Sequence, residues 1–391
     1  MPKSLKAVLW LIITLGFLFG FAGLVFPNQS PLVEAPPLDT FQFQRLHIFL
    51  FNLVAGGTVL LFFTEDRQNP TWRSGLFLLG SLAFSLTAFF NRYFWAILLA
   101  IGLALLVEVV RIQRFSFFPT DFFKTTVPVA RKFHQAALLC LSLGLLIAAF
   151  VMANNQYLHW INQPMLILDD FFLGFSFPLS LMTFSVIFSL AREDSDRRIQ
   201  VLREISFWVI NLGVIIFFLF IILQIFAMQV VVACLLFADV LLVFFLFRHD
   251  SQALEPDNYL VSGILFLVFT SITGIIITLA ENYLPAQDPN AWALLLQIHA
   301  YLALYGWNLS GLTVIIRYKE FPLHLHSLEI ILLHWLVVSL LAPLGSLYLV
   351  FAVIALPTFA VLIWMILFQK GNQKFRRHAS NILTRHPSPQ T

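Results

Sequence analysis

Residues 297–311 read QIHAYLALYGWNLSG, and this stretch decides how the rest of the chain is interpreted. It lies within an apolar run of helical length, yet it carries one His, two Tyr, one Trp, one Asn and one Gln. Polar groups inside a membrane-crossing helix are costly, and they usually face protein or water. The stretch therefore predicts a membrane helix that stands inside a bundle.

The composition of the whole chain supports a membrane protein. Of its 391 residues, 60% are hydrophobic and only 11% are charged, whereas a soluble domain has roughly 25% charged residues. Because so few charged residues cannot cover a water-exposed surface, we expect lipid to surround the protein. The sequence contains no glycine-rich phosphate loop or other motif typical of a soluble active site.

A helix needs about 20 apolar residues to cross a bilayer. Twelve runs meet this requirement: 5–26, 42–64, 74–91, 93–112, 134–153, 165–190, 205–226, 228–247, 259–280, 292–316, 326–342 and 346–368. We therefore predict an all-α, polytopic integral membrane protein with twelve transmembrane helices over residues 1–369. The polar segment 370–391 is predicted to be a disordered cytoplasmic tail.

The basic residues predict the orientation of these helices. If the N-terminus is inside, all but Arg45 and Arg92 of the 23 Lys and Arg residues fall in segments on the inner side. Lys and Arg concentrate in cytoplasmic loops, so both termini are expected in the cytoplasm. The expected location of the protein is the cytoplasmic (inner) membrane. Because topology accounts for these charges, they give no indication of nucleic-acid binding.

Two histidines lie at similar depth in different helices. His47 is near the start of run 42–64, and His299 is about two turns into run 292–316. Both runs begin on the outer side in this topology. Tyr301 follows His299 by two residues, which is about 200° around a helix, so the two side chains point in nearly opposite directions. Such a helix either stands between two sites or is a central helix held by interhelical hydrogen bonds.

Asp239 is the carboxylate placed deepest in the predicted membrane. It lies in the middle of run 228–247, far from any other charged residue. We expect it to face protein, where it is protonated, paired with another helix or in contact with water. Glu108 is nearer the inner end of its run and can reach Arg111 or water. Gly16 and Gly20 form a GxxxG pair, which predicts a close helix contact.

A His early in the second of twelve helices and a His motif early in the tenth resemble the heme-copper oxidase superfamily. That superfamily includes the catalytic subunits of cytochrome oxidases and nitric oxide reductases. The stretch HAYLALYGW (299–307) is similar to the HxHLxLxGW form of helix ten in reductase-like members. The resemblance implies heme b, with His299 at the position of the high-spin heme ligand. It also implies that His47 matches one low-spin ligand, and that Tyr301 stands where the other should be.

The chain departs from that family at its copper site. The family's copper ligands are histidines of helices six and seven, but runs 165–190 and 205–226 contain no His. The resemblance therefore implies no copper centre, and it argues against oxygen or nitric oxide reduction. Three outcomes stay open for heme: His47 and His299 share one heme, His47 binds heme together with Tyr301 because phenolate is a known iron ligand, or the fold has lost its heme.

Three functions follow from these alternatives. The first is a heme b protein that transfers electrons or senses a gas. The second is a cofactor-free partner of other membrane or redox subunits in a complex. The third is a transporter or proton path that uses Asp239. Whether the chain is an enzyme is left open by the sequence.

Overall fold

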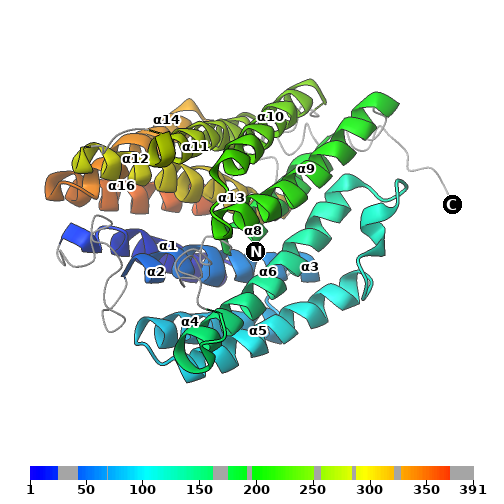
Figure 1. Cartoon of the computed structure of the whole chain (residues 1–391), viewed down its shortest axis with the longest axis horizontal. Coiled ribbons are helices and arrows are strands. Elements are labelled where there is room, and N and C mark those ends of the chain that lie inside the picture. The colour runs from blue at the N-terminus through cyan, green and yellow to red at the C-terminus, as the bar shows by residue number, and fades with distance from the viewer. Residues whose placement is uncertain are drawn as a thin grey trace.

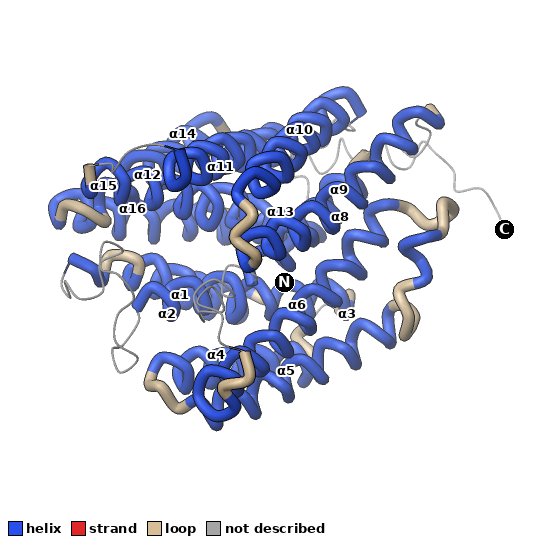
Figure 2. The backbone as a smooth tube through the Cα atoms, in the orientation of Figure 1, coloured by secondary structure: helices blue, strands red, loops and turns tan. Residues whose placement is uncertain are grey.

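The computed structural model describes residues 1–24, 43–67, 69–161, 175–191, 196–250, 257–283, 288–320 and 327–369. Within these ranges the chain is helical nearly throughout and contains no β-strand (Figure 2). Lipid offers no hydrogen bonds to the backbone, so a membrane segment has to pair its own N–H and C=O groups. The tail 370–391 lies outside the described residues, as does the whole segment 25–42.

A helical segment lies within each of the twelve predicted runs. Three of these segments are continuous helices with an internal change of winding, which we name helix two (α2, η3 and α3), helix ten (α12, η7 and α13) and helix eleven (α14, η9 and α15). The bounds are α1 Lys3–Phe19, α2 Phe43–Ile48, η3 Phe49–Gly57, α3 Thr58–Glu65, α4 Trp72–Phe89, α5 Tyr93–Arg114, α6 Val129–Ala153, α8 Ser176–Ser189, α9 Arg197–Ile222, α10 Phe226–Asp250, α11 Asp257–Tyr283, α12 Pro289–Tyr301, η7 Leu302–Asn308, α13 Leu309–Arg317, α14 Leu328–Leu336, η9 Val337–Leu341, α15 Ala342–Gly345 and α16 Leu349–Phe368.

Within the described ranges, nine helices are long and apolar enough to cross a membrane. Three segments at predicted spans are not among them. Helix α1 has 17 residues and α8 has 14, and helix ten carries the polar residues of the stretch 297–311. The structure therefore supports a multi-pass membrane protein and an all-helical fold. The count of twelve spans and the cytoplasmic placement of both termini stay predictions.

Helix two lies at the centre of the bundle. Figure 1 shows α1 and α2 between the α4–α5 pair on one side and α12 and α16 on the other, and these helices pack against one another. In the span Arg45–Glu65, 89% of the residues are buried inside the protein. The glycine pair in α1 permits this packing, because a Cβ at Gly16 would lie 3.4 Å from the backbone oxygen of His47. The predicted GxxxG contact is confirmed.

Helices two, ten and eleven each contain an internal wide turn of π-helix, at Phe49–Gly57, Leu302–Asn308 and Val337–Leu341, and α6 ends in a further one at Asn154–Leu158. Such turns shift the i→i+4 hydrogen bonds to i→i+5 and are frequent at functional sites. Two of these turns begin within three residues after a buried histidine, which is His47 in helix two and His334 in helix eleven. The turn in helix ten holds Tyr305, which contacts both of these residues.

Candidate functional site

His47 is buried where α1, helix two and helix ten meet. Its Nδ1 lies 3.2 Å from the carbonyl oxygen of Gly16 and 3.0 Å from the Tyr305 hydroxyl. A carbonyl oxygen can only accept, so Nδ1 carries the hydrogen and donates it to Gly16. A Cβ at Gly20 would lie 2.9 Å from the Tyr301 hydroxyl and 3.1 Å from His47 Nδ1. Only glycine leaves room for these two side chains.

Helices two and ten are neighbours, as the depth of their polar residues predicts. Besides the contact between His47 and Tyr305, Asn308 donates from Nδ2 to Asn52 Oδ1 at 3.3 Å. Asn308 also accepts from the Ser180 hydroxyl at 2.8 Å, and Trp307 donates to the same hydroxyl at 2.9 Å. Interhelical hydrogen bonds thus satisfy much of the polarity in the stretch 297–311.

His299 and Tyr301 point to different neighbours, as their spacing predicts. His299 faces α11, where its Nδ1 lies 3.1 Å from the carbonyl oxygen of Thr270 and 3.0 Å from the Thr273 hydroxyl. Tyr301 faces α15, and its hydroxyl lies 3.2 Å from that of Ser346. The structure therefore places Tyr301 beside His47, with ring centroids 6.4 Å apart, and it places His299 on the other side of helix ten.

The ring orientation of these histidines suits metal ligation. An imidazole that binds a metal through one nitrogen usually donates the other N–H to a carbonyl or carboxylate. His47 and His299 both donate Nδ1–H to a backbone carbonyl, and neither Nε2 has a hydrogen-bond partner among the described residues. His134 and His334 do the reverse, because each forms its hydrogen bond through Nε2.

A heme sandwiched between two of the predicted ligands does not fit this arrangement. His47 and His299 lie on different sides of helix ten, so they cannot share one iron. Phe17 packs against both tyrosines of this site, with its ring centroid 5.9 Å from that of Tyr301 and 5.0 Å from that of Tyr305, so no heme plane fits between Tyr301 and these rings. The two imidazoles thus lie at separate places, and each forms its hydrogen bond to a backbone carbonyl through Nδ1.

Asp239 faces protein, as predicted, and only 5% of it is exposed. It lies on α10, which packs against α9, and the nearest polar group of that helix is the Ser206 hydroxyl. Neither Asp239 Oδ2 nor Ser206 Oγ has a partner at hydrogen-bonding distance, although both atoms are buried. This carboxyl group is thus enclosed without a matching charge, which is costly unless it is protonated.

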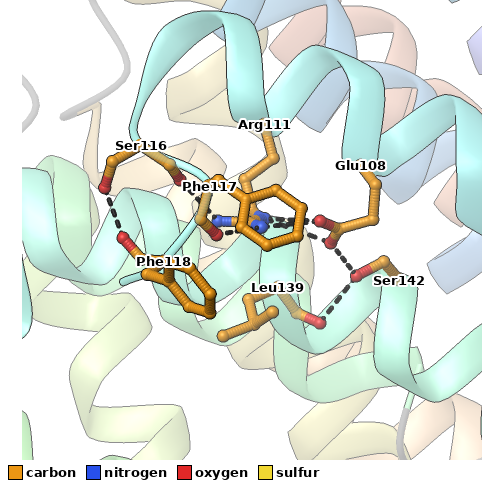
Figure 3. Close-up of polar contacts among 7 residues, drawn as sticks. All are labelled: Glu108, Arg111, Ser116, Phe117, Phe118, Leu139 and Ser142. Atoms are coloured by element: carbon orange, nitrogen blue, oxygen red, sulfur yellow. Dashed lines mark hydrogen bonds and ion pairs between the residues drawn. The ribbon is translucent and has the colours of Figure 1, made fainter. Parts of the chain in front are cut away.

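Glu108 has the partner that its position predicts. Figure 3 shows Arg111 between Glu108 and the loop that follows α5, with Arg111 Nη2 2.6 Å from Glu108 Oε2. Arg111 also donates to the carbonyl oxygens of Ser116 and Phe117, and the Ser142 hydroxyl of α6 donates to Glu108. The ion pair lies within α5, and the hydrogen bond from Ser142 joins it to α6 at one end of the bundle.

Several partners in the site were not predicted from the sequence. Ser346, Thr270 and Ser180 lie in separate helices with no motif that connects them to helix ten. Only the glycine pair of α1 was visible as a contact surface. Among the described residues, no three His, Cys, Asp or Glu side chains converge as metal ligands.

Comparisons with protein-family models, with curated proteins and with solved structures find no match for this chain.

Proposed function

We propose that the protein is a divergent, heme-copper-oxidase-like membrane protein that binds heme b and serves in electron transfer or gas sensing. The observation that supports this proposal is the ring orientation of His47 and His299. The two histidines singled out by the family resemblance each use Nδ1–H on a backbone carbonyl and keep Nε2 available. Two further helical histidines with hydrogen bonds, the half-buried His134 and the buried His334, keep Nδ1 instead.

The protein would hold each ligand by fixing its tautomer. The Gly16 carbonyl orients the His47 ring, and the Tyr305 hydroxyl lies against the same nitrogen. The Thr270 carbonyl and the Thr273 hydroxyl orient His299. A hydrogen bond from Nδ1–H to a carbonyl raises the basicity of Nε2. A bound heme would supply a redox-active iron, and the surrounding Phe and Tyr rings would exclude water from it.

The visible spectrum of the full chain, purified after expression with ample heme, tests the proposal. We expect a heme b spectrum that changes on reduction, and we expect His47→Ala and His299→Ala each to remove or shift part of it. His334→Ala is the matched control, because that buried ring has its Nε2 on the Tyr305 carbonyl. His159→Asn is the loop control, since Asn tolerates the positive φ of 51° at that position.

A colourless, well-folded protein would refute the heme proposal. It would support the alternative of a cofactor-free partner subunit, in which helix ten keeps its polar residues for packing. Loss of the spectrum in His334→Ala, with His47→Ala unaffected, would also contradict the assignment of ligands.

A second candidate function, a proton path through Asp239, is favoured by its buried carboxyl group, whose Oδ2 has no hydrogen-bond partner. A carboxyl group without a charged partner can exchange a proton without breaking an ion pair. The full chain in liposomes with a trapped pH dye tests this function. Asp239→Asn should abolish a proton leak that the wild type shows, and equal rates in the two proteins would exclude it.

The topology is part of the proposal: twelve spans, with both termini in the cytoplasm. The support is the placement of all but two basic residues on one side. Single cysteines introduced in 281–291 and in 191–204, after replacement of the free Cys140 and Cys234, should be labelled from opposite sides of the membrane. Labelling of both from the same side would contradict this topology.

A further inference from the structure

A pocket of about 380 Å³ opens where α3 and α5 end and α4 begins. Its lining residues are Thr64, Glu65, Arg67, Thr71, Trp72, Arg73, Val110, Gln113 and Arg114. The three helices are candidate membrane spans, so the pocket lies at a boundary between membrane and water. It is separate from the histidines of helices two and ten.

The pocket has more positive than negative charge. Arg67, Arg73 and Arg114 line it together with a single carboxylate, Glu65, which accepts a hydrogen bond from the Thr71 hydroxyl. Arg67 and Arg114 have no carboxylate partner within the part of the chain that the structure describes. The pocket thus presents guanidinium groups that are not neutralised, and such groups bind phosphate strongly.

Arg73 is held in place and still has an unused donor. It donates from Nη1 to Gln113 and lies over the Trp72 ring, 5.5 Å from its centroid. Its Nε is buried and has no hydrogen-bond partner. Thr71, which caps α4 by accepting from the Ser74 amide, puts the positive end of that helix at the same place. Helix N-termini favour anions, so the backbone adds to the charge of the arginines.

The surface beside the pocket is apolar. Trp72 is 70% exposed, and Leu76, one helical turn further along α4, is also exposed. On α5, the exposed Val109 lies one turn before Gln113. Trp is enriched at the level of lipid headgroups, and exposed apolar side chains of a membrane helix face acyl chains. An anion bound here would therefore lie directly beside the hydrocarbon.

We propose that this pocket binds the phosphate group of an anionic membrane lipid, with its acyl chains along the exposed faces of α4 and α5. The proposed topology places the pocket on the cytoplasmic side, where anionic lipids attract basic residues. A free phosphate or phosphorylated metabolite offers the same chemistry without the acyl chains, and the experiment separates these sources.

Native mass spectrometry of the full chain, with phosphatidylglycerol or phosphatidylcholine added, measures lipid retention. The test variant is Arg67→Gln with Arg114→Gln. The matched control is Arg197→Gln with Arg198→Gln, which removes two exposed charges at the start of α9 on the same predicted side. We expect the wild type to prefer phosphatidylglycerol and the test variant to bind it roughly 25-fold more weakly, which is about 1 kcal/mol per lost charge. The control should bind as the wild type does.

A second arm adds inorganic phosphate as a competitor. Little displacement of phosphatidylglycerol at millimolar phosphate supports the lipid. If inorganic phosphate binds to the wild type as tightly as the lipid does, and not to the test variant, the ligand is a soluble phosphate and the lipid assignment is overturned. If both double variants retain phosphatidylglycerol equally, the pocket is not an anion site. Thermal unfolding of each variant identifies any loss of fold.

Discussion

Helix two and helix α10 are both apolar enough to cross a membrane, but they occupy different environments. In helix two, 89% of the span is buried inside the protein, against 28% in α10. The more buried helix is also the one with more polar residues, among them His47, Asn52 and Thr58. Lipid is as apolar as a leucine side chain, so hydrophobic residues gain little by facing inward. Polarity, not hydrophobicity, therefore marks the centre of this bundle.

The two helices also differ in how the buried ionisable side chain of each is hydrogen-bonded. The His47 ring has two hydrogen-bonding neighbours, on α1 and helix ten, whereas some uncharged groups of helix two, Asn52 Nδ2 and Thr58 Oγ1, are buried without a partner. Asp239 on α10 has one neighbour on α9 and no hydrogen bond to its Oδ2. A partnered polar group holds helices together, whereas an unpartnered one is a cost that function or protonation must offset. Four predictions, in decreasing order of expected effect, test which buried contacts hold the helices together.

Arg111→Met should destabilise the protein by about 3 kcal/mol, because it leaves Glu108 at the membrane end without its charged partner. The value is at the low end for a buried pair since the Glu108 side chain is 25% exposed. Thermal unfolding in detergent measures the effect. Lys124→Met, which breaks a surface pair with Asp121, should cost less than about 1 kcal/mol. Equal losses in the two variants would contradict the distinction.

Gly311→Ala should cost about 2 kcal/mol, because its new methyl group would overlap the Thr183 side chain where α13 packs against α8. Gly75→Ala, on the outer helix α4, is the matched control, since a Cβ there meets nothing within 4 Å. That control should be neutral or should stabilise by roughly 0.5–1 kcal/mol, the difference in helix propensity. Both are measured by unfolding midpoints. A neutral Gly311→Ala would mean that the central packing is loose.

Asp239→Leu should stabilise the protein by about 1–2 kcal/mol, because it removes a buried carboxyl group with an unpartnered oxygen. The same unfolding assay measures the gain. Destabilisation instead would indicate a partner for Asp239 and would remove the contrast with helix two. A gain in stability that is accompanied by loss of proton flux in liposomes would assign Asp239 to transport.

Tyr305→Phe should destabilise by about 1 kcal/mol, since it removes one hydroxyl that contacts His47 Nδ1 and leaves the ring packing in place. The Gly16 carbonyl keeps its bond to that nitrogen, so the loss should be small. Phe359→Leu, which changes a ring beside Tyr305 without touching the hydroxyl, reports the effect of packing alone. If Tyr305→Phe costs nothing, the hydroxyl contributes no net hydrogen bond.

The aqueous end of α5 offers one pH-dependent feature. A hydrogen bond from Lys124, together with Arg131, holds the pKa of Asp121 below its usual range. A carboxyl group whose pKa is lower in the folded protein stabilises the fold at pH values above its pKa in the unfolded chain. This contribution is lost as the pH falls through its pKa in the folded protein. Because the side chains of Lys124 and Arg131 are about half exposed to water and salt, the loss on acidification should be slight.

Sequence alone determined the features that depend on local spacing. The helical period places His299 and Tyr301 on opposite sides of helix ten, and they do face α11 and α15 respectively. The position of Asp239 in an apolar run predicts that it faces protein, and it does. The spacing of Glu108 and Arg111 predicts their contact, since residues three apart are neighbours on a helix.

Only the tertiary structure decided which groups meet across helices. It turned the Nδ1 atoms of His47 and His299 toward the carbonyls of Gly16 and Thr270, and it put the Phe17 ring beside Tyr301. The apolar runs are so alike in composition that none predicts its neighbour, and a serine or threonine hydroxyl finds its partner only when the helices pack. Whether His47 and His299 share a site therefore depended on the direction in which helix ten faces its neighbours, which no local pattern encodes.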